Sequence, residues 1–291
     1  RRMSTPLLIT PKAEDIAGQP ILRPLPAAKC RSVGPFVFFD HMLEKAYAPG
    51  SGMNINQHPH IGLSTLTYLF EGELQHKDSL GSDQLVRPGD VSWMSAGRAV
   101  AHVERTPDHL RQKGSRLHGL QVWLALPQAL EQGEPSYSHH PAASLPRSEA
   151  MGVQITLIAG SGFCLQSPVP VPSPTLYAEL KLAAGANLLI PAEHRERALY
   201  LIAGEAQLEG NDLPRHSLAV LPEGEELLLS ACGECHLALI GGEPLGPRRM
   251  YWNFVASDAA LLEKAKQDWA AWNWPRVPGE TARIELPART P

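Results

Sequence analysis

The chain has 291 residues, of which 43% are hydrophobic, and a formal net charge of −4 at pH 7. This composition is that of a globular protein, and it argues against a disordered chain and against direct nucleic-acid binding. No apolar run approaches the roughly 20 residues of a transmembrane helix, and the N-terminus lacks the pattern of a signal sequence. The sequence therefore predicts a soluble cytoplasmic protein with one large domain or two of ordinary size, and no membrane partner.

Short apolar segments separated by turn residues fill the first half of the chain. Residues 36–42 form an apolar run after Gly34-Pro35, and residues 63–70, 91–94 and 116–127 have the alternation and the β-branched or aromatic content of strands. Several short strands with frequent turns predict a sandwich or barrel. Residues 127–147 are rich in Pro, Gln, Glu, Ser and His and are interpreted as a connector.

Two short motifs in this half have the spacing of metal ligands. His58-Pro59-His60 is followed about forty residues later by His102-Val103-Glu104. In a strand, side chains at i and i+2 point to the same face, so each motif can aim both members at one point. If the two strands lie side by side, His58, His60, His102 and Glu104 converge on one metal ion.

The second half of the chain resembles a degenerate repeat of the first half. Tyr200-Leu-Ile-Ala-Gly204 corresponds to Tyr68-Leu-Phe-Glu-Gly72 within another series of short apolar strands. The positions equivalent to the four candidate ligands are Ile190, Ala192, Leu229 and Ala231. None of these can bind a metal, so the copy keeps strands and turns without the site. His194 lies nearby but has no partner in register, and it is interpreted as a surface or hydrogen-bonded histidine.

The chain ends in a helix and an extended tail. Ser257 or Asp258 can act as N-cap for residues 259–269, whose apolar side chains share one face: Leu261, Leu262, Ala265 and Trp269. This pattern predicts a helix that packs on a barrel. Residues 278–287 are expected to form a short strand or extended arm.

The four cysteines are few and scattered, which is typical of reduced thiols. Cys232 and Cys235 have CxxC spacing, but a zinc site would need a second pair and a redox motif would need a helix N-terminus. Their flanks have the pattern of strands, so an ordinary hairpin turn is the preferred interpretation.

Several of these segments together resemble the pirin family, over nearly the whole chain. The resemblance rests on residues 34–41, 58–62, 67–68, 76–79, 88–90, 93–94, 96–97, 102–104 and 252–255. It implies a mainly β bicupin: two tandem cupin barrels of the double-stranded β-helix or jelly-roll type, with a C-terminal helix. Residues 1–135 would form the metal-binding cupin barrel, and residues 150–291 the degenerate second barrel with the helix and arm.

The resemblance also implies iron on three histidines and one glutamate, which would be His58, His60, His102 and Glu104. Many members have Arg after the second histidine, Glu a few residues later, and Ser between the last His and Glu. Here Ile61, Ser64 and Val103 stand at these places. These differences keep all four ligands and concern the surroundings of the metal.

The donor set itself suits one divalent metal, which could be Fe, Mn, Ni, Cu or Zn. Relatives in the family are associated with quercetin 2,3-dioxygenase activity, which makes Fe(II), O2 and a flavonol or other polyphenol the expected cofactor and substrates. Glu104 would take the enol proton of the substrate. His76 and Asp78 could orient ligands, and Trp93, Met94 and Phe39 are candidates for an apolar wall.

The resemblance leaves a second function open, since pirins are also known as cofactors of transcription regulators. In that case the metal would serve a regulatory or redox-sensing protein that binds a protein partner and has no catalytic role. Other cupin activities, such as isomerases, are a further alternative. A wide apolar mouth over the metal would favour the enzyme, and a sealed site would favour the regulator.

Overall fold

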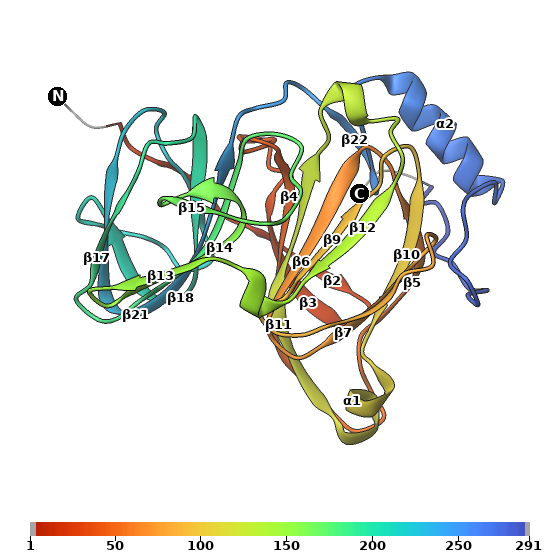
Figure 1. The fold of residues 1–291 in the computed structure, drawn as a ribbon, viewed down its shortest axis with the longest axis horizontal. Coiled ribbons are helices and arrows are strands. Elements are labelled where there is room, and N and C mark those ends of the chain that lie inside the picture. The colour runs from red at the N-terminus through yellow and green to blue at the C-terminus, as the bar shows by residue number, and fades with distance from the viewer. Residues whose placement is uncertain (1–3, 289–291) are drawn as a thin grey trace. The chain divides into compact units, whose positions relative to one another are not determined.

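The computed structural model describes residues 4–288. Strands dominate it and form two compact units that interleave along the chain. Unit 1 comprises the N-terminal residues up to Lys12, Leu22–Phe39 and Ala143–Pro244. Unit 2 comprises Ala13–Ile21, Asp40–Ala142 and the C-terminal residues from Leu245. Figure 1 shows strands throughout and the helix α2 in blue.

Most strands of two antiparallel sheets, with the orders β12-β9-β6-β11-β4-β3-β2 and β5-β10-β7-β8, belong to unit 2. The end of β3 from Leu22 and the start of β4 up to Phe39 belong to unit 1. The strands predicted between residues 36 and 127 are confirmed. The bounds are β2 Lys12–Ile16, β3 Gln19–Leu25, β4 Phe36–Tyr47, β5 Asn54–His60, β6 Leu63–Glu71, β7 Leu74–Asp78, β8 Asp83–Val86, β9 Val91–Ser95, β10 Val100–Arg105, β11 Ser115–Ala125 and β12 Ser136–His140.

The interpretation of residues 127–147 as a plain connector is wrong, because they include β12. This strand pairs with β9 from Ser136 opposite Ser95 to His140 opposite Val91. Its sequence, Ser-Tyr-Ser-His-His, has no apolar alternation because it lies at the edge of its sheet. A short helix, α1 (Asp108–Lys113), was also not predicted.

Unit 1 contains a sheet of ten strands whose main path is β1-β20-β18-β21-β16-β14-β13. The bounds are β1 Leu7–Ile9, β13 Arg147–Ala150, β14 Val153–Gly162, β15 Leu165–Gln166, β16 Thr175–Leu182, β17 Asn187–Ile190, β18 Glu196–Leu208, β19 Asn211–Asp212, β20 Leu218–Val220 and β21 Leu227–Gly242. Its core is apolar and includes Ile190, Leu229 and Ala231, three of the positions equivalent to the candidate ligands. The Nε2 atom of His194 lies 2.7 Å from the carbonyl oxygen of Ser161, which confirms that this histidine is hydrogen-bonded within the fold.

The predicted hairpin turn at Cys232 and Cys235 is wrong. Both residues lie within the single long strand β21, where its register against β18 shifts between Gly204 and Ala206. A local β-bulge therefore takes up the residues that the sequence suggested as a turn. Both thiols are free, and burial raises the pKa of Cys235 to about 11, which is the opposite of an activated redox thiol.

The C-terminal residues of unit 2 form the hairpin β22 (Arg249–Tyr251) and β23 (Phe254–Ala256) and the helix α2 (Ala259–Ala270). The predicted N-cap is confirmed, since the Asp258 side chain accepts a hydrogen bond from the Ala260 amide. Leu262, Ala265 and Trp269 are the buried face of α2. None of the helices within residues 4–288 is long and apolar enough to span a bilayer.

Candidate metal centre

Strand pairing brings the two sequence motifs together in unit 2. The antiparallel register of β10 places His102 directly opposite His58 on β5, with a shift of the ladder between His102 and Glu104. On its other side, β10 pairs with β7, which places His102 opposite Asp78 and Glu104 opposite His76. The expectation that the two strands lie side by side is therefore confirmed.

Three imidazoles converge at this point. His58, His60 and His102 each offer a ring nitrogen, and these atoms all lie within 4.8 Å of one another. The Nε2 atoms of His60 and His102 are 3.1 Å apart. Two nitrogens bound to one metal at about 2.1 Å would have a comparable separation, so the arrangement has the geometry of a metal site.

The opposite ring nitrogens of His58 and His60 have carbonyl acceptors that fix their tautomers, and that of His102 faces His76. His58 Nδ1 donates to the carbonyl oxygen of Asn56 at 2.8 Å, and His60 Nδ1 donates to the carbonyl oxygen of Asn253 at 3.2 Å. His102 Nδ1 lies 3.5 Å from His76 Nδ1. Protons on the three Nδ1 atoms leave the three Nε2 lone pairs for a cation, which is the usual arrangement of metal-binding histidines.

Burial keeps these imidazoles uncharged. It lowers the pKa of His58 to about 4 and the pKa values of His60 and His102 well below the usual 6.5, and the neighbouring histidines add to this effect. Neutral imidazole is the form that binds a metal ion.

Glu104 lies beside the three histidines. Its Oε1 atom accepts hydrogen bonds from Gln121 Nε2 at 2.7 Å and from Thr67 Oγ1 at 3.5 Å. Its Oε2 atom lies 3.9 Å from His102 Nε2. Burial raises the pKa of Glu104, although His76 and the two hydrogen bonds oppose that shift. One oxygen is therefore anchored to β6 and β11, and the other remains close to the imidazoles.

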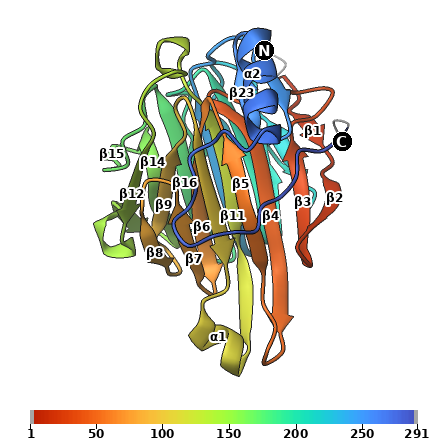
Figure 2. The same ribbon diagram turned by 90° about the vertical axis from the view of Figure 1, so that its right-hand side faces the viewer.

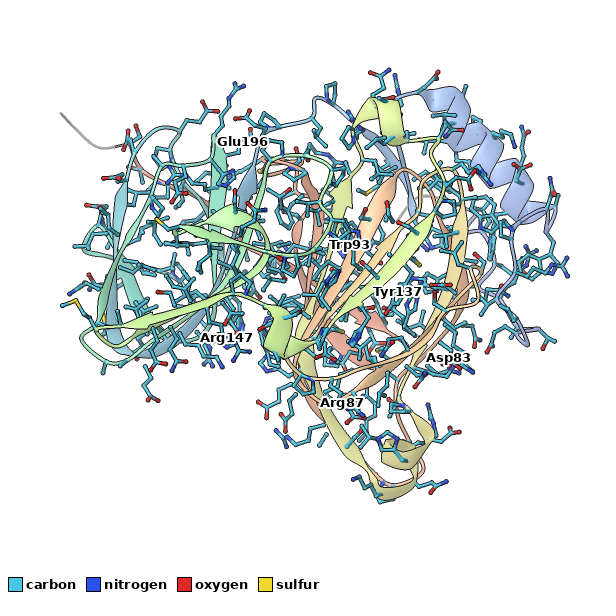
Figure 3. All side chains as sticks on the ribbon, viewed as in Figure 1. Asp83, Arg87, Trp93, Tyr137, Arg147 and Glu196 are labelled. Atoms are coloured by element: carbon cyan, nitrogen blue, oxygen red, sulfur yellow. The ribbon has the colours of Figure 1, made fainter. Side chains whose placement is uncertain are left out.

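His76 and Asp78 extend this network from β7. His76 Nε2 donates to Asp78 Oδ2 at 2.7 Å, and the other ring nitrogen of His76 lies 3.5 Å from His102 Nδ1. Burial would raise the pKa of Asp78, but the contact with His76 holds it below its usual value. Tyr137 of β12 stacks on His76 with ring centroids 4.2 Å apart. Figure 3 labels Tyr137.

The candidate wall residues have different positions. Met94 packs with Val100 and Tyr137, and the pairing of β9 with β6 places it on the same face as Ser92. Trp93 alternates with Met94 and therefore points to the opposite face of β9. Phe39 packs against Tyr200 within unit 1 with the rings tilted by 48°, so it does not line the site in unit 2.

Sequence reasoning missed several residues that surround the ligands. Trp123 on β11 packs edge-on against His60 with ring centroids 5.3 Å apart. Gln121 lies two residues away on the same face of β11 and holds Glu104. A polar residue among apolar ones in a strong strand was the available signal for Gln121. The carbonyl of Asn253 gave no signal, because any residue provides one.

The site is closed to solvent. His58, His60, His102 and Glu104 expose 6%, 1%, 1% and 4% of their surface. The cavity that adjoins Glu104 and Gln121 has a volume of about 10 Å³, which is enough for roughly one water molecule. A larger ligand therefore requires side chains around the metal centre to move.

The donor set fits a divalent metal ion. Three neutral imidazoles and a nearby carboxylate suit Fe, Mn, Ni, Cu or Zn, and the absence of thiolate among these donors distinguishes the site from common structural zinc sites. The converging Nε2 lone pairs support this assignment independently of the sequence motif.

Comparison with known proteins decides the family. Residues 18–124 match the model of the pirin family, and residues 177–275 match the model of the pirin C-terminal cupin domain. The chain belongs to the pirin family. The expected fold is thus confirmed as mainly β with two cupin domains and a C-terminal helix. The domain limits 1–135 and 150–291 stay a prediction.

The chain is similar to several bacterial proteins over most of its length. It is 43% identical over 268 residues to a pirin-like protein of Caulobacter vibrioides, which covers 91% of this chain and 93% of the relative. It is 35% identical over 266 residues to a Pseudomonas aeruginosa protein named provisionally as a quercetin 2,3-dioxygenase. This alignment covers 90% of the present chain and 82% of the relative. The crystal structure of quercetin 2,3-dioxygenase from Acinetobacter baumannii superimposes with a TM-score of 0.91 at 32% identity, covering 98% of this chain and 96% of that one.

Proposed function

We propose that this pirin is a dioxygenase that cleaves flavonol-type polyphenols such as quercetin with O2. Its metal would be Fe(II), bound by His58, His60, His102 and Glu104. The observation that carries the proposal is the convergence of three neutral, buried imidazoles beside one carboxylate in unit 2. The names of a relative at 35% identity and of a structure at 32% identity support the choice of substrate.

The metal would supply a Lewis acid with open positions for substrate and O2. Glu104 would remove the proton of the flavonol 3-hydroxyl group through Oε2. Gln121 and Thr67 hold Oε1, so that the second oxygen keeps a fixed direction during proton transfer.

Other side chains would orient the ligands and exclude water. The chain from Asp78 through His76 fixes the ring of His102. Trp123 provides apolar surface beside His60, and a dry environment strengthens charge interactions in the site.

Oxygen uptake tests this function directly. The protein is stripped of metal, loaded with Fe(II) under anaerobic conditions, and mixed with quercetin in air-saturated buffer. We expect consumption of one O2 per quercetin and loss of the flavonol absorption band. No turnover with quercetin or any other polyphenol, by protein that has bound iron, would contradict the proposal.

A regulatory, metal-dependent binding protein is the second candidate, and the closed site favours it. The four candidate ligands expose 6% of their surface or less, and the adjoining cavity holds about 10 Å³. A bound flavonol has to displace side chains, whereas a redox-sensing metal does not need an opening. A protein partner that binds only one oxidation state of the iron-loaded protein, with no polyphenol turnover, would support this alternative.

A further inference from the structure

The last residues of unit 2 pack against the back of the two ligand strands. We define residues 251–284 as the C-terminal clamp. Phe254, Trp269 and Trp274 of the clamp form one buried cluster with Ile61, the residue after β5, and with Ala101 and Val103 of β10. These three alternate with the ligands His60, His102 and Glu104, so the ligands point into the barrel and their neighbours point into the clamp.

Hydrogen bonds join the clamp to β5. The main-chain amide of Ile284 donates to the Gln57 carbonyl oxygen at 2.8 Å, and the amide of Val277 donates to Gln57 Oε1 at 2.6 Å. Gln57 is 0% exposed and directly precedes the ligand His58. Just beyond β5, the amide of Val255 donates to the carbonyl oxygen of Ile61 at 3.2 Å. Figure 2 shows this terminal stretch of chain, in dark blue, crossing the strands of unit 2.

A further hydrogen bond joins the clamp to β10. Trp274 Nε1 donates to the carbonyl oxygen of Val100 at 3.0 Å, two residues before His102. Arg105, one residue after Glu104, pairs with Glu280 at 2.9 Å. The clamp is thus bonded on both sides of the ligand pair of β10.

One clamp residue contacts a ligand directly. The carbonyl oxygen of Asn253 accepts from His60 Nδ1 at 3.2 Å and thereby directs His60 Nε2 toward His102 Nε2. The acceptor is main chain, so its position depends on how the hairpin of β22 and β23 is packed and on the hydrogen bond from Val255 to Ile61.

We propose that the C-terminal clamp is a positioning element of the metal centre: it fixes the spacing of β5 and β10 and the ring orientation of His60, and so sets how tightly the metal is held. The inference rests on the metal centre of the proposed function but not on its substrate. A segment about 150–220 residues away in sequence from the ligands then controls metal retention.

The test measures metal release in the full-length protein. Trp274→Phe removes the hydrogen bond to Val100 and keeps an aromatic ring, and Ile284→Pro removes the amide that donates to Gln57. Neither substitution touches a ligand. Val86→Ala is the matched control, because Val86 belongs to a different apolar cluster of unit 2 that excludes the clamp. Each protein is loaded with Fe(II) under anaerobic conditions, and the rate of metal transfer to a chromogenic chelator is recorded together with the urea midpoint.

We expect each clamp variant to release the metal about 5-fold faster or more, as the loss of one hydrogen bond predicts, while Val86→Ala releases it at the parent rate despite its lower urea midpoint. We also expect metal to slow tryptic cleavage at the exposed Arg276 in the parent. Release rates equal to the parent, or rates that follow the urea midpoint in all three variants, would overturn the inference and leave the metal centre standing. A parent protein that binds no metal would overturn both.

Discussion

His60 Nε2 and His102 Nε2 lie 3.1 Å apart in unit 2. His60 Nδ1 donates to the Asn253 carbonyl, and His102 Nδ1 is directed at His76. Rings that carry their protons on Nδ1 leave both Nε2 lone pairs close together. Two such lone pairs repel each other unless both bind one cation beside them, which makes the pair suited to a metal ion.

The first prediction concerns His102. His102→Ala removes the donor at the centre of the triad, so we expect metal content after loading to fall at least tenfold, from about one ion per chain to a small fraction. The fold should persist, because the strand ladders and apolar clusters of both units do not depend on the metal. Metal analysis and circular dichroism measure the two effects. His139→Ala, which changes a histidine paired with Asp90 away from the triad, is the control. Global unfolding of His102→Ala would instead show that the metal is structural.

The second prediction separates metal binding from proton transfer. Glu104→Gln keeps an oxygen near His102 but loses the negative charge and the basic group. We expect partial metal binding and a fall in quercetin turnover of about 100-fold or more, which is the usual contribution of a general base. Oxygen uptake at equal metal loading measures the effect. Unchanged turnover would remove Glu104 from the proton-transfer role.

The same motif shows what could be predicted from the sequence. Two pairs at i and i+2 were enough to propose His58, His60, His102 and Glu104, because strand alternation fixes the face of each side chain. The structure brings the three histidines together, and it places one Glu104 oxygen 3.9 Å from His102. The helix at 259–269 was predicted for an equally local reason, since its N-cap and apolar face lie within one short segment.

Other features were not predictable because they depend on distant contacts. The strand β12 has a polar sequence, and pairing with β9 alone makes it a strand. The carbonyl of Asn253 has no side-chain signature, and its role follows from where β22 and β23 pack. Trp93 was expected near the site from its motif, but it alternates with Met94 along β9 and points to the opposite face.

The third prediction concerns the metal-free protein and pH. The folded pKa values of His58, His60 and His102 lie below their unfolded value of about 6.5. The unfolded chain therefore binds more protons as the pH falls, and the free energy of unfolding decreases from pH 6.5 toward pH 4. Each histidine contributes up to about 1.4 kcal/mol per pH unit to this decrease in the free energy of unfolding. The three together contribute up to about 4 kcal/mol per pH unit. The raised pKa of Glu104 acts in the opposite direction, but it is one group against three.

Urea denaturation of metal-free protein at several pH values between 7.5 and 4.5 measures this slope. His102→Leu should reduce it by about a third, because one of the three buried imidazoles is gone. A free energy of unfolding that stays constant from pH 7 to pH 5 would mean that the imidazoles are not buried as neutral groups.

The fourth prediction concerns Asp78, which is not a candidate ligand but orients the ligand His102 through His76. Asp78→Asn weakens the hold on His76, because a carboxylate that accepts from His76 Nε2 becomes an amide. His76 can then rotate or change tautomer, and His102 Nδ1 loses its defined acceptor. Loss of such an outer partner typically lowers metal affinity 10- to 100-fold. Competition with a chelator of known affinity measures the change.

Asp83→Asn, at an exposed position on the neighbouring strand β8, should leave the affinity unchanged. If Asp78→Asn also leaves it unchanged, His102 is oriented by packing alone, and the chain from Asp78 through His76 has no part in metal binding.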